Sequence, residues 1–403
     1  MNPLYIAYCR IRQTTFRAFM PFLDWREPTV IAGPGALMKL PEIICDRGHR
    51  KVLLVTDAGL IASGLIDPFV ARMQAAGLAV AIYDATAANP TIDNIEEALS
   101  LYHAEGCDAL VAFGGGSPID AAKAVGARIA NPKKTISQMK GALKVRRAIP
   151  SLYVIPTTAG TGSEATLAAV VTDTATQEKY ALNDPVLIPR LAILDPRLLV
   201  SLPKMITATT GIDALTHAIE AYIGHANTYR TRRDAREAVR LIFSHLLRSY
   251  EDGTDLDARG SMQKAAFLAG TAFTRAYVGN VHALAHTLGG FYKVAHGLAN
   301  AVILPYILDF YGAAVAKPLA ELAAVAGIAD PEATTAENAL RFIAAIRRLN
   351  TALGIPATIS GVIRKEDIDF MTAQASAEAN PLYPVPVIMG TADFRKIYEL
   401  IAS

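Results

Sequence analysis

The chain has 403 residues, of which 52% are hydrophobic and 19% charged, and its formal net charge at pH 7 is +2. This length exceeds what one ordinary core holds, so we expect two domains, and the apolar content excludes a disordered protein. Lysine and arginine form no basic stripe or face, which argues against a nucleic-acid-binding protein.

Residues 1–25 are predicted to be an N-terminal extension. It is basic through Arg10, Arg12 and Arg17 and has no acidic residue before Asp24. We interpret it as an arm or short helix docked on the domain or on a partner subunit; a transit peptide and residues added by a misassigned start codon are the alternatives. No apolar run approaches the roughly 18 to 20 residues that span a bilayer, so no membrane partner is expected.

Residues 26–200 alternate between strand and helix patterns. Apolar and β-branched runs predict strands at 51–57, 79–84, 109–113, 152–156 and 192–194, a hairpin at 168–173 and 180–183, and helices at 66–76, 92–105 and 117–130. Strands that alternate with helices of this length predict an α/β dinucleotide-binding domain with a parallel, Rossmann-like sheet covered on both faces.

Residues 201–403 change in character. Helical periodicity predicts helices at 209–223, 231–250, 258–277, 281–292, 298–310 and 336–353, and β-branched runs are few. We therefore predict an all-helical C-terminal domain.

A glycine-rich turn opens the predicted helix 117–130. Gly114, Gly115, Gly116 and Ser117 follow a predicted strand, so the backbone can approach an anion at a helix N-terminus. A lone turn of this kind is equally consistent with a plain tight turn. The second small-residue loop, PTTAGTGSE at 156–164, also follows a strand, and two such loops favour a dinucleotide.

An aspartate and three histidines occur at ligand-like spacing in two apolar segments. Asp213 and His217 lie four apart in GIDALTHAIEAY, and His282 and His296 belong to VHALAHTLGGFYKVAHGLAN. Positions four apart share a helix face, and imidazole binds divalent metals. This spacing predicts a metal site of one carboxylate and three imidazoles, facing the glycine-rich loops between the two domains.

Cysteine usage is consistent with a reducing compartment. Cys9, Cys45 and Cys107 are widely separated and form no CxxC pair. A thiolate zinc site or disulfide framework is not expected, and a cytoplasmic location fits.

Four segments together resemble the iron-containing (group III) alcohol dehydrogenase family. GGGSPIDAAK, PTTAGTGSE and the two histidine segments match its signatures in order and spacing, and the resemblance runs from about Trp25 to the C-terminus. It implies reversible oxidation of an alcohol to an aldehyde or ketone by NAD, with a divalent metal, Fe(II) first and Zn(II) as the alternative. It also implies a homodimer or higher homo-oligomer.

The resemblance also implies roles for individual residues. The metal ligands would be Asp213, His217, His282 and His296, and His286 matches the histidine placed near substrate and nicotinamide, as a proton relay or as support for the ligands. The implied cofactor contacts are Asp57, Asn89, Gly114, Gly115, Gly116, Ser117, Asp120, Thr157, Thr158 and Lys179. Asp57 ends a predicted strand, where a carboxylate can bind a ribose 2′-hydroxyl and favour NAD over NADP, although a strand-end cap is common.

One other enzyme class shares this architecture. NAD- and metal-dependent cyclases resembling 3-dehydroquinate synthase need several basic side chains for a phosphorylated, carboxylated substrate. Around the ligand segments the residues are mostly Ala, Leu, Val and Gly, and Lys293 is the nearest base. This composition favours a small neutral alcohol over the cyclase substrate.

Overall fold

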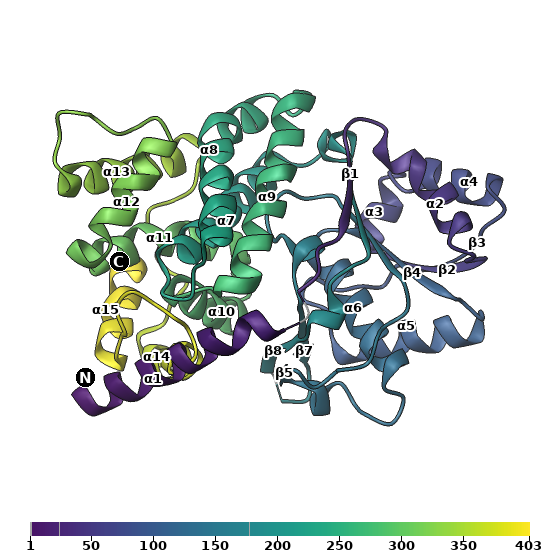
Figure 1. Cartoon of the computed structure of the whole chain (residues 1–403), viewed down its shortest axis with the longest axis horizontal. Helices are drawn as coiled ribbons and strands as arrows, with labels where there is room; N and C mark the ends of the chain where they lie inside the picture. The colour runs from purple at the N-terminus through teal and green to yellow at the C-terminus, as the bar shows by residue number, and fades with distance from the viewer. Residues whose placement is uncertain (1, 24, 177) are drawn as a thin grey trace. The chain divides into compact units, whose positions relative to one another are not determined.

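A computed structural model of the chain describes residues 2–23, 25–176 and 178–403. The chain forms two compact units. The α/β unit comprises Asp24–Leu202 and Thr254–Gln263, and the helical unit comprises Met1–Leu23, Pro203–Gly253 and Lys264–Ser403. The purple-to-teal and the green-to-yellow parts of the ribbon in Figure 1 correspond largely to these two units, apart from the purple N-terminal helix.

The α/β unit is built on a six-stranded parallel sheet. Its order is β1-β9-β6-β4-β2-β3, and every pair of neighbours is parallel. The strands are β1 (Thr29–Ala32), β2 (Lys51–Val55), β3 (Ala79–Tyr83), β4 (Ala109–Gly114), β6 (Leu152–Pro156) and β9 (Leu191–Leu194). The parallel sheet predicted from the sequence is confirmed, and the carboxyl ends of β2, β4 and β6 lie side by side because these strands are neighbours.

Helices connect these strands. They are α2 (Leu40–Asp46), α3 (Ala58–Ala62), α4 (Asp67–Ala75), α5 (Ile92–Ala104) and α6 (Gly116–Ala130). Strand β4 is buried along its whole length, and nine residues of α6 are buried as well. A small second sheet, β5-β8-β7, contains the predicted hairpin, with β7 (Ala168–Asp173) antiparallel to β8 (Glu178–Asn183) and β5 (Gly141–Ala142) parallel to β8.

The helical unit confirms the predicted all-helical half. Its helices from residue 203 onward are α7 (Lys204–Ile223), α8 (Tyr229–Glu251), α10 (Asn280–Tyr292), α11 (His296–Tyr311), α12 (Ala316–Val325), α13 (Thr335–Ala352), α14 (Ile368–Ala379) and α15 (Thr391–Ala402). Helix α9 (Leu256–Ala276) begins in the α/β unit and ends in the helical one. Helix α7 is almost wholly buried, as a helix that is apolar on most faces must be.

One described stretch, His296–Val325, has the length and apolar composition of a membrane span. The expectation that no apolar run is this long is therefore wrong. The stretch consists of α11, a short 3-10 turn and α12, and 61% of its most apolar window is buried. Helix α11 is apolar on most sides and most of its residues are buried, which makes it a core helix.

The N-terminal extension forms helix α1 (Pro3–Phe19), which belongs to the helical unit. Asn2 caps it by accepting from the Leu4 amide, and Pro3 takes the first-turn position that proline favours. One face is buried through Cys9 and Gln13. The opposite face leaves the large apolar side chains of Leu4 and Ile11 79% and 66% exposed.

Candidate metal and cofactor sites

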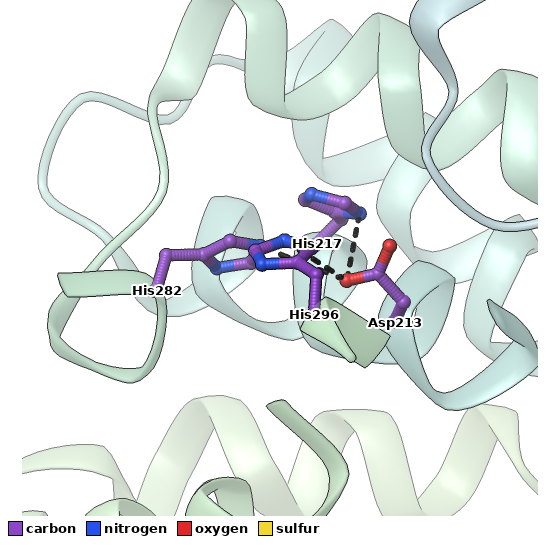
Figure 2. Close-up of side chains that lie close together, drawn as sticks. All are labelled: Asp213, His217, His282 and His296. Atoms are coloured by element: carbon purple, nitrogen blue, oxygen red, sulfur yellow. Dashed lines mark ion pairs between the residues drawn. The ribbon is translucent and has the colours of Figure 1, made fainter. Parts of the chain in front are cut away.

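Three helices of the helical unit bring the four predicted ligands together. Asp213 and His217 lie one turn apart on α7, His282 lies in the first turn of α10, and α11 begins at His296. One ligand atom from each residue lies within 4.8 Å of the others. Figure 2 shows the imidazole rings around the Asp213 carboxylate. Three of the residues are buried, and His296 is partly exposed.

The ligand atoms converge on one point. Oδ1 of Asp213 lies 3.6 Å from Nε2 of His296, 3.9 Å from Nε2 of His282 and 4.0 Å from Nδ1 of His217. The Asn300 side-chain nitrogen lies 2.6 Å from Oδ1 of Asp213 and 3.2 and 3.1 Å from the Nε2 atoms of His282 and His296. An amide nitrogen carries two hydrogens, so it cannot donate to all three acceptors, whereas a cation there can satisfy them together.

Glu220 orients His282. Its carboxylate accepts from the amides of Gly279 and Val281 at 2.7 and 2.8 Å and lies 2.6 Å from Nδ1 of His282. Because the Glu220 carboxylate already accepts from two amides, its contact with His282 places the ring proton on Nδ1, which donates to Glu220. Burial raises the pKa of Glu220 to about 8. Its role could have been found from sequence, because it lies seven residues after Asp213, on the same helix face.

The cluster depends on close helix contact. A Cβ on Gly297, the second residue of α11, would lie 2.4 Å from the Thr209 carbonyl oxygen of α7. Only glycine allows this approach, which places His296 opposite Asp213. On the other side, the His217 ring stacks on Phe273 with centroids 4.2 Å apart.

His286 lies beside the cluster, one turn after His282 on α10. Its ring stacks on His296 with centroids 5.2 Å apart, and its side chain is 30% exposed. Nδ1 of His286 lies 2.6 Å from the Glu378 carboxylate of α14, which also accepts from the Tyr383 hydroxyl at 2.7 Å. The sequence provides no spacing signal for Glu378, because it lies 92 positions from His286.

The two predicted glycine-rich loops touch in the α/β unit. Gly114 ends β4 with φ of +155°, and a Cβ on Gly116 would lie 2.9 Å from Cγ2 of Thr161. A Cβ on Gly115 would lie 3.5 Å from the Thr158 side chain, and the Thr157 amide donates to the Gly114 carbonyl at 3.0 Å. The loops therefore form one surface at the N-terminus of α6, where free amides and the helix dipole favour an anion.

Other predicted cofactor residues border this surface. The Asn89 amide donates to the Ser117 hydroxyl at 3.2 Å, and the Lys179 ammonium donates to Oδ1 of Asn89 at 2.7 Å. Asn89 has φ of 63°, a left-handed conformation that asparagine tolerates better than most residues. Asn89, Ser117 and Lys179 thus form a continuous polar rim beside the Gly114–Ser117 loop.

Asp57 and Asp120 also have partners within the fold. Oδ1 of Asp57 caps α3 by accepting from the Leu60 amide at 3.0 Å. The Asp120 carboxylate accepts from the Ser163 hydroxyl at 2.6 Å and the Val170 amide at 3.2 Å, and burial raises its pKa. Asp57 thus uses one oxygen at the start of α3, whereas Asp120 uses both, one for the 156–164 loop and the other for strand β7.

The buried Lys123 side chain holds the end of the second small-residue loop, 156–164, and the residues that follow it. Its buried ammonium donates to the carbonyls of Ser163, Thr166 and Ala168 at 2.7, 2.9 and 2.8 Å. Burial lowers the pKa of Lys123 to about 8. A charge-assisted donor to three carbonyls fixes the loop that faces Gly114–Ser117.

Two family descriptions match the chain. "Iron-containing alcohol dehydrogenase" matches residues 28–196, and "Fe-containing alcohol dehydrogenase family, C-terminal" matches residues 207–401. The chain is 37% identical to the NAD-dependent methanol dehydrogenase of Bacillus methanolicus over 349 residues, which are 86% of this chain and 91% of the relative. It is 36% identical to lactaldehyde reductase of Escherichia coli (strain K12) over 348 residues, 86% of this chain and 90% of that one.

The fold agrees with the same family. The crystal structure of a 1,3-propanediol oxidoreductase superposes with a TM-score of 0.90 at 34% identity, covering 94% of this chain and 99% of the other. The chain belongs to the iron-containing alcohol dehydrogenase family. It is an oxidoreductase of the NAD-dependent alcohol dehydrogenase and aldehyde reductase class, which acts on small alcohols or aldehydes, so the predicted family, fold and reaction class are confirmed.

Proposed function

We propose that this enzyme binds one divalent cation through Asp213, His217, His282 and His296 and interconverts a small alcohol and its carbonyl compound with NAD. The observation that carries the proposal is the convergence of an aspartate oxygen and two imidazole nitrogens on one amide group that can satisfy only part of them. The third ring, that of His217, lies within the same 4.8 Å cluster.

Fe(II) is the proposed native metal, and Zn(II) is the alternative. Imidazole and carboxylate donors suit both ions, and affinity order lets zinc displace iron. The family description names iron. Glu220 supports either ion, because holding the Nδ1 proton of His282 leaves Nε2 as the ligand atom.

NAD is proposed to lie on the surface formed by the two glycine-rich loops. Gly114–Ser117 would face the pyrophosphate, with Thr157, Thr158, Asn89 and Lys179 around it. The second carboxylate oxygen of Asp57 would accept from a ribose hydroxyl and repel a 2′-phosphate. Asp120 acts in this proposal by fixing Ser163 rather than by a direct contact.

The protein side chains have separable tasks in the reaction. When bound, the cation supplies polarisation of the substrate oxygen and the nicotinamide accepts or supplies hydride. His286 donates its Nδ1–H to the Glu378 carboxylate, which leaves Nε2 as the proton acceptor or donor. The stacked His296 ring keeps this imidazole next to the cluster.

Substrate size, assembly and location follow as further parts of the proposal. The relatives named for methanol and lactaldehyde suggest an alcohol of few carbons. Self-association is proposed because β1 is a largely exposed strand at the end of the sheet order and α1 exposes Leu4 and Ile11. The described cysteines are all free, which fits the cytoplasm.

The experiment measures NADH formation and metal content on one preparation. Anaerobically purified protein loaded with Fe(II) or Zn(II) is supplied with NAD and methanol, ethanol or 1,3-propanediol, and in reverse with NADH and lactaldehyde. We expect net NADH change only with metal present, at about one ion per chain. Absence of turnover with every alcohol and aldehyde, despite bound metal, contradicts the proposal.

A pair of histidine variants tests the roles at the site. His286→Ala should lower kcat about 100-fold or more, the range for loss of a general acid or base, while bound metal is unchanged. His245→Ala on α8 is the control, because Nδ1 of His245 lies 3.0 Å from the Leu241 carbonyl of its own helix. Loss of metal from His286→Ala would assign His286 to the ligand set instead.

A further inference from the structure

We infer that helix α1 is a positioning element of the active site, which acts through Tyr383 and Glu378 to fix the imidazole of His286. The inference rests on the proposed function, in which His286 handles the proton. Helix α1 precedes residue 28, where the family match begins. All the contacts that carry the inference lie within the helical unit.

Helix α1 binds the segment 383–388, which follows α14, through hydrogen bonds. The Arg10 guanidinium donates to the carbonyls of Val385 and Pro386 at 2.7 and 2.8 Å. The Gln13 side chain donates to the Tyr383 carbonyl at 2.7 Å and accepts from Arg10 at 2.9 Å. Three donors from two neighbouring turns thus satisfy three carbonyls of an irregular segment that has no helix or sheet of its own.

Apolar side chains also pack between α1 and the 383–388 segment. Cys9 of α1 is fully buried and forms a small cluster with Val385 and Ile388. Phe16 meets the Tyr277 ring edge-on with centroids 5.7 Å apart. One side of α1 therefore packs against the 383–388 segment, whereas the other side, with Leu4 and Ile11, is exposed.

Hydrogen bonds connect the 383–388 segment to His286, beside the candidate metal site. The Tyr383 hydroxyl donates to Glu378 at 2.7 Å, and the same carboxylate oxygen lies 2.6 Å from Nδ1 of His286. Burial raises the pKa of Tyr383 well above its usual value, so the phenol stays protonated and continues to donate. The hydrogen bond from Tyr383 thereby orients the Glu378 carboxylate, and the carboxylate in turn orients the ring of His286.

The segment is also tied to the helices that carry the predicted ligands. The Asn280 side chain, two residues before His282, donates to the Val387 carbonyl at 3.3 Å. The His225 amide, just after α7, donates to the Pro384 carbonyl at 2.6 Å. Loosening α1 would release one side of this segment while leaving these ties, so the expected defect concerns orientation and not folding of the whole unit.

A carboxylate on Nδ1 has a defined chemical consequence. It fixes the tautomer with the proton on Nδ1, so that Nε2 is the basic atom toward the site. If Glu378 turns away, both tautomers become populated and a fraction of the enzyme presents the wrong nitrogen. The effect should appear in kcat and leave NAD binding unchanged, because the proposed NAD contacts belong to the α/β unit.

The test combines histidine NMR with kinetics. Full-length protein carrying ¹⁵N-histidine and Zn(II), which is diamagnetic, is compared with Glu378→Ala, Glu378→Gln, Tyr383→Phe and the double variant Arg10→Ala/Gln13→Ala. Arg12→Ala is the matched control, because Arg12 lies on the exposed side of α1. Metal content and the other histidine resonances serve as checks of folding.

In the wild type the His286 resonances should report a proton on Nδ1. Glu378→Ala should lose that signature and about tenfold or more in kcat, within the range for partners that orient active-site histidines, with KM for NAD unchanged. Glu378→Gln should restore part of both, because its amide oxygen still accepts. The double variant and Tyr383→Phe should shift the same resonances in the same direction by less, and Arg12→Ala should match the wild type.

Two results separate this inference from the proposed function. If the double variant keeps the wild-type His286 resonances and kcat while Glu378→Ala changes them, α1 is not a positioning element. If the wild type turns over no alcohol but its His286 tautomer depends on Arg10 and Gln13, the positioning inference stands and the proposed function fails.

Discussion

Single residues outside the ligand set decide how well the candidate metal site works. Glu220 accepts three donors, the amides of Gly279 and Val281 and Nδ1 of His282, and none of them is offered to solvent because the site is buried. A Cβ on Gly279 would lie 2.7 Å from Oε1 of Glu220, so the contact is close-packed. The Glu220 carboxylate therefore fixes both the start of α10 and the orientation of the His282 ring.

Glu220→Gln should weaken metal binding about 10- to 100-fold, the usual loss when the partner of a histidine ligand is changed. A glutamine has one acceptor oxygen and directs its NH₂ group at donors, so a buried amide or the His282 ring loses its partner. Competition titration of Zn(II) against a chelator measures the effect.

Glu237→Gln is the control for this titration, because Glu237 forms a surface pair with Arg240 in the same unit. An affinity for Glu220→Gln equal to that of the wild type would show that Glu220 serves the helix start only.

Sequence spacing predicts this site only as far as helix periodicity extends. Asp213 and His217 share a face of one helix, and Glu220 lies on the same face. Glu220, the partner of His282, could therefore have been predicted from the sequence. Asn300 lies one turn after His296 on α11 and could have been found in the same way. Glu378 could not, because the contact between α10 and α14 depends on tertiary packing that no local pattern encodes.

At the scale of elements, the strongest patterns were also the most predictable. Buried strands such as β2 and β4 are continuous apolar runs, and α5, α8 and α13 begin at threonine capping boxes. Five helices have no predicted counterpart: the short helices α2 and α3, and α12, α14 and α15 in the C-terminal third. Helix α14, IDFMTAQASAEA, carries apolar and polar residues on every side of its axis, so its periodic signal is weak.

Close approach of α11 to α7 leads to a prediction about glycine. Gly297→Ala should destabilise the helical unit and abolish tight metal binding, because its Cβ would overlap the Thr209 carbonyl and force α11, with His296, away from Asp213. Overpacking of this kind costs about 1–3 kcal/mol. Thermal unfolding and metal content of the purified variant are the measurements.

Gly290→Ala is the matched control for this variant. Gly290 lies in α10, is exposed, and has nothing within 4 Å of an added Cβ. Alanine in a helix interior should be neutral or stabilising by about 0.5–1 kcal/mol there. Equal stability and equal metal content of the two variants would mean that α11 does not need this approach to bind metal.

At the scale of the whole molecule, the two chemical tasks belong to different compact units. The four predicted metal ligands and His286 lie in the helical unit, and the predicted NAD contacts lie in the α/β unit. Each ligand should therefore stabilise its own unit first. A ligand at about 100 times its dissociation constant adds about 2.7 kcal/mol, which slows exchange through unfolding of that unit about 100-fold.

Hydrogen exchange read by mass spectrometry tests this division on the intact chain. Zn(II) added to metal-free protein should protect α7, α10 and the first turns of α11, and NADH should protect residues 114–120 and 157–163. In His282→Ala the protection by Zn(II) should disappear while that by NADH remains, because the two sets of contacts share no residue. Equal protection of both units by Zn(II) alone would instead show that they unfold as one cooperative body, and the assignment of separate stabilities would be wrong.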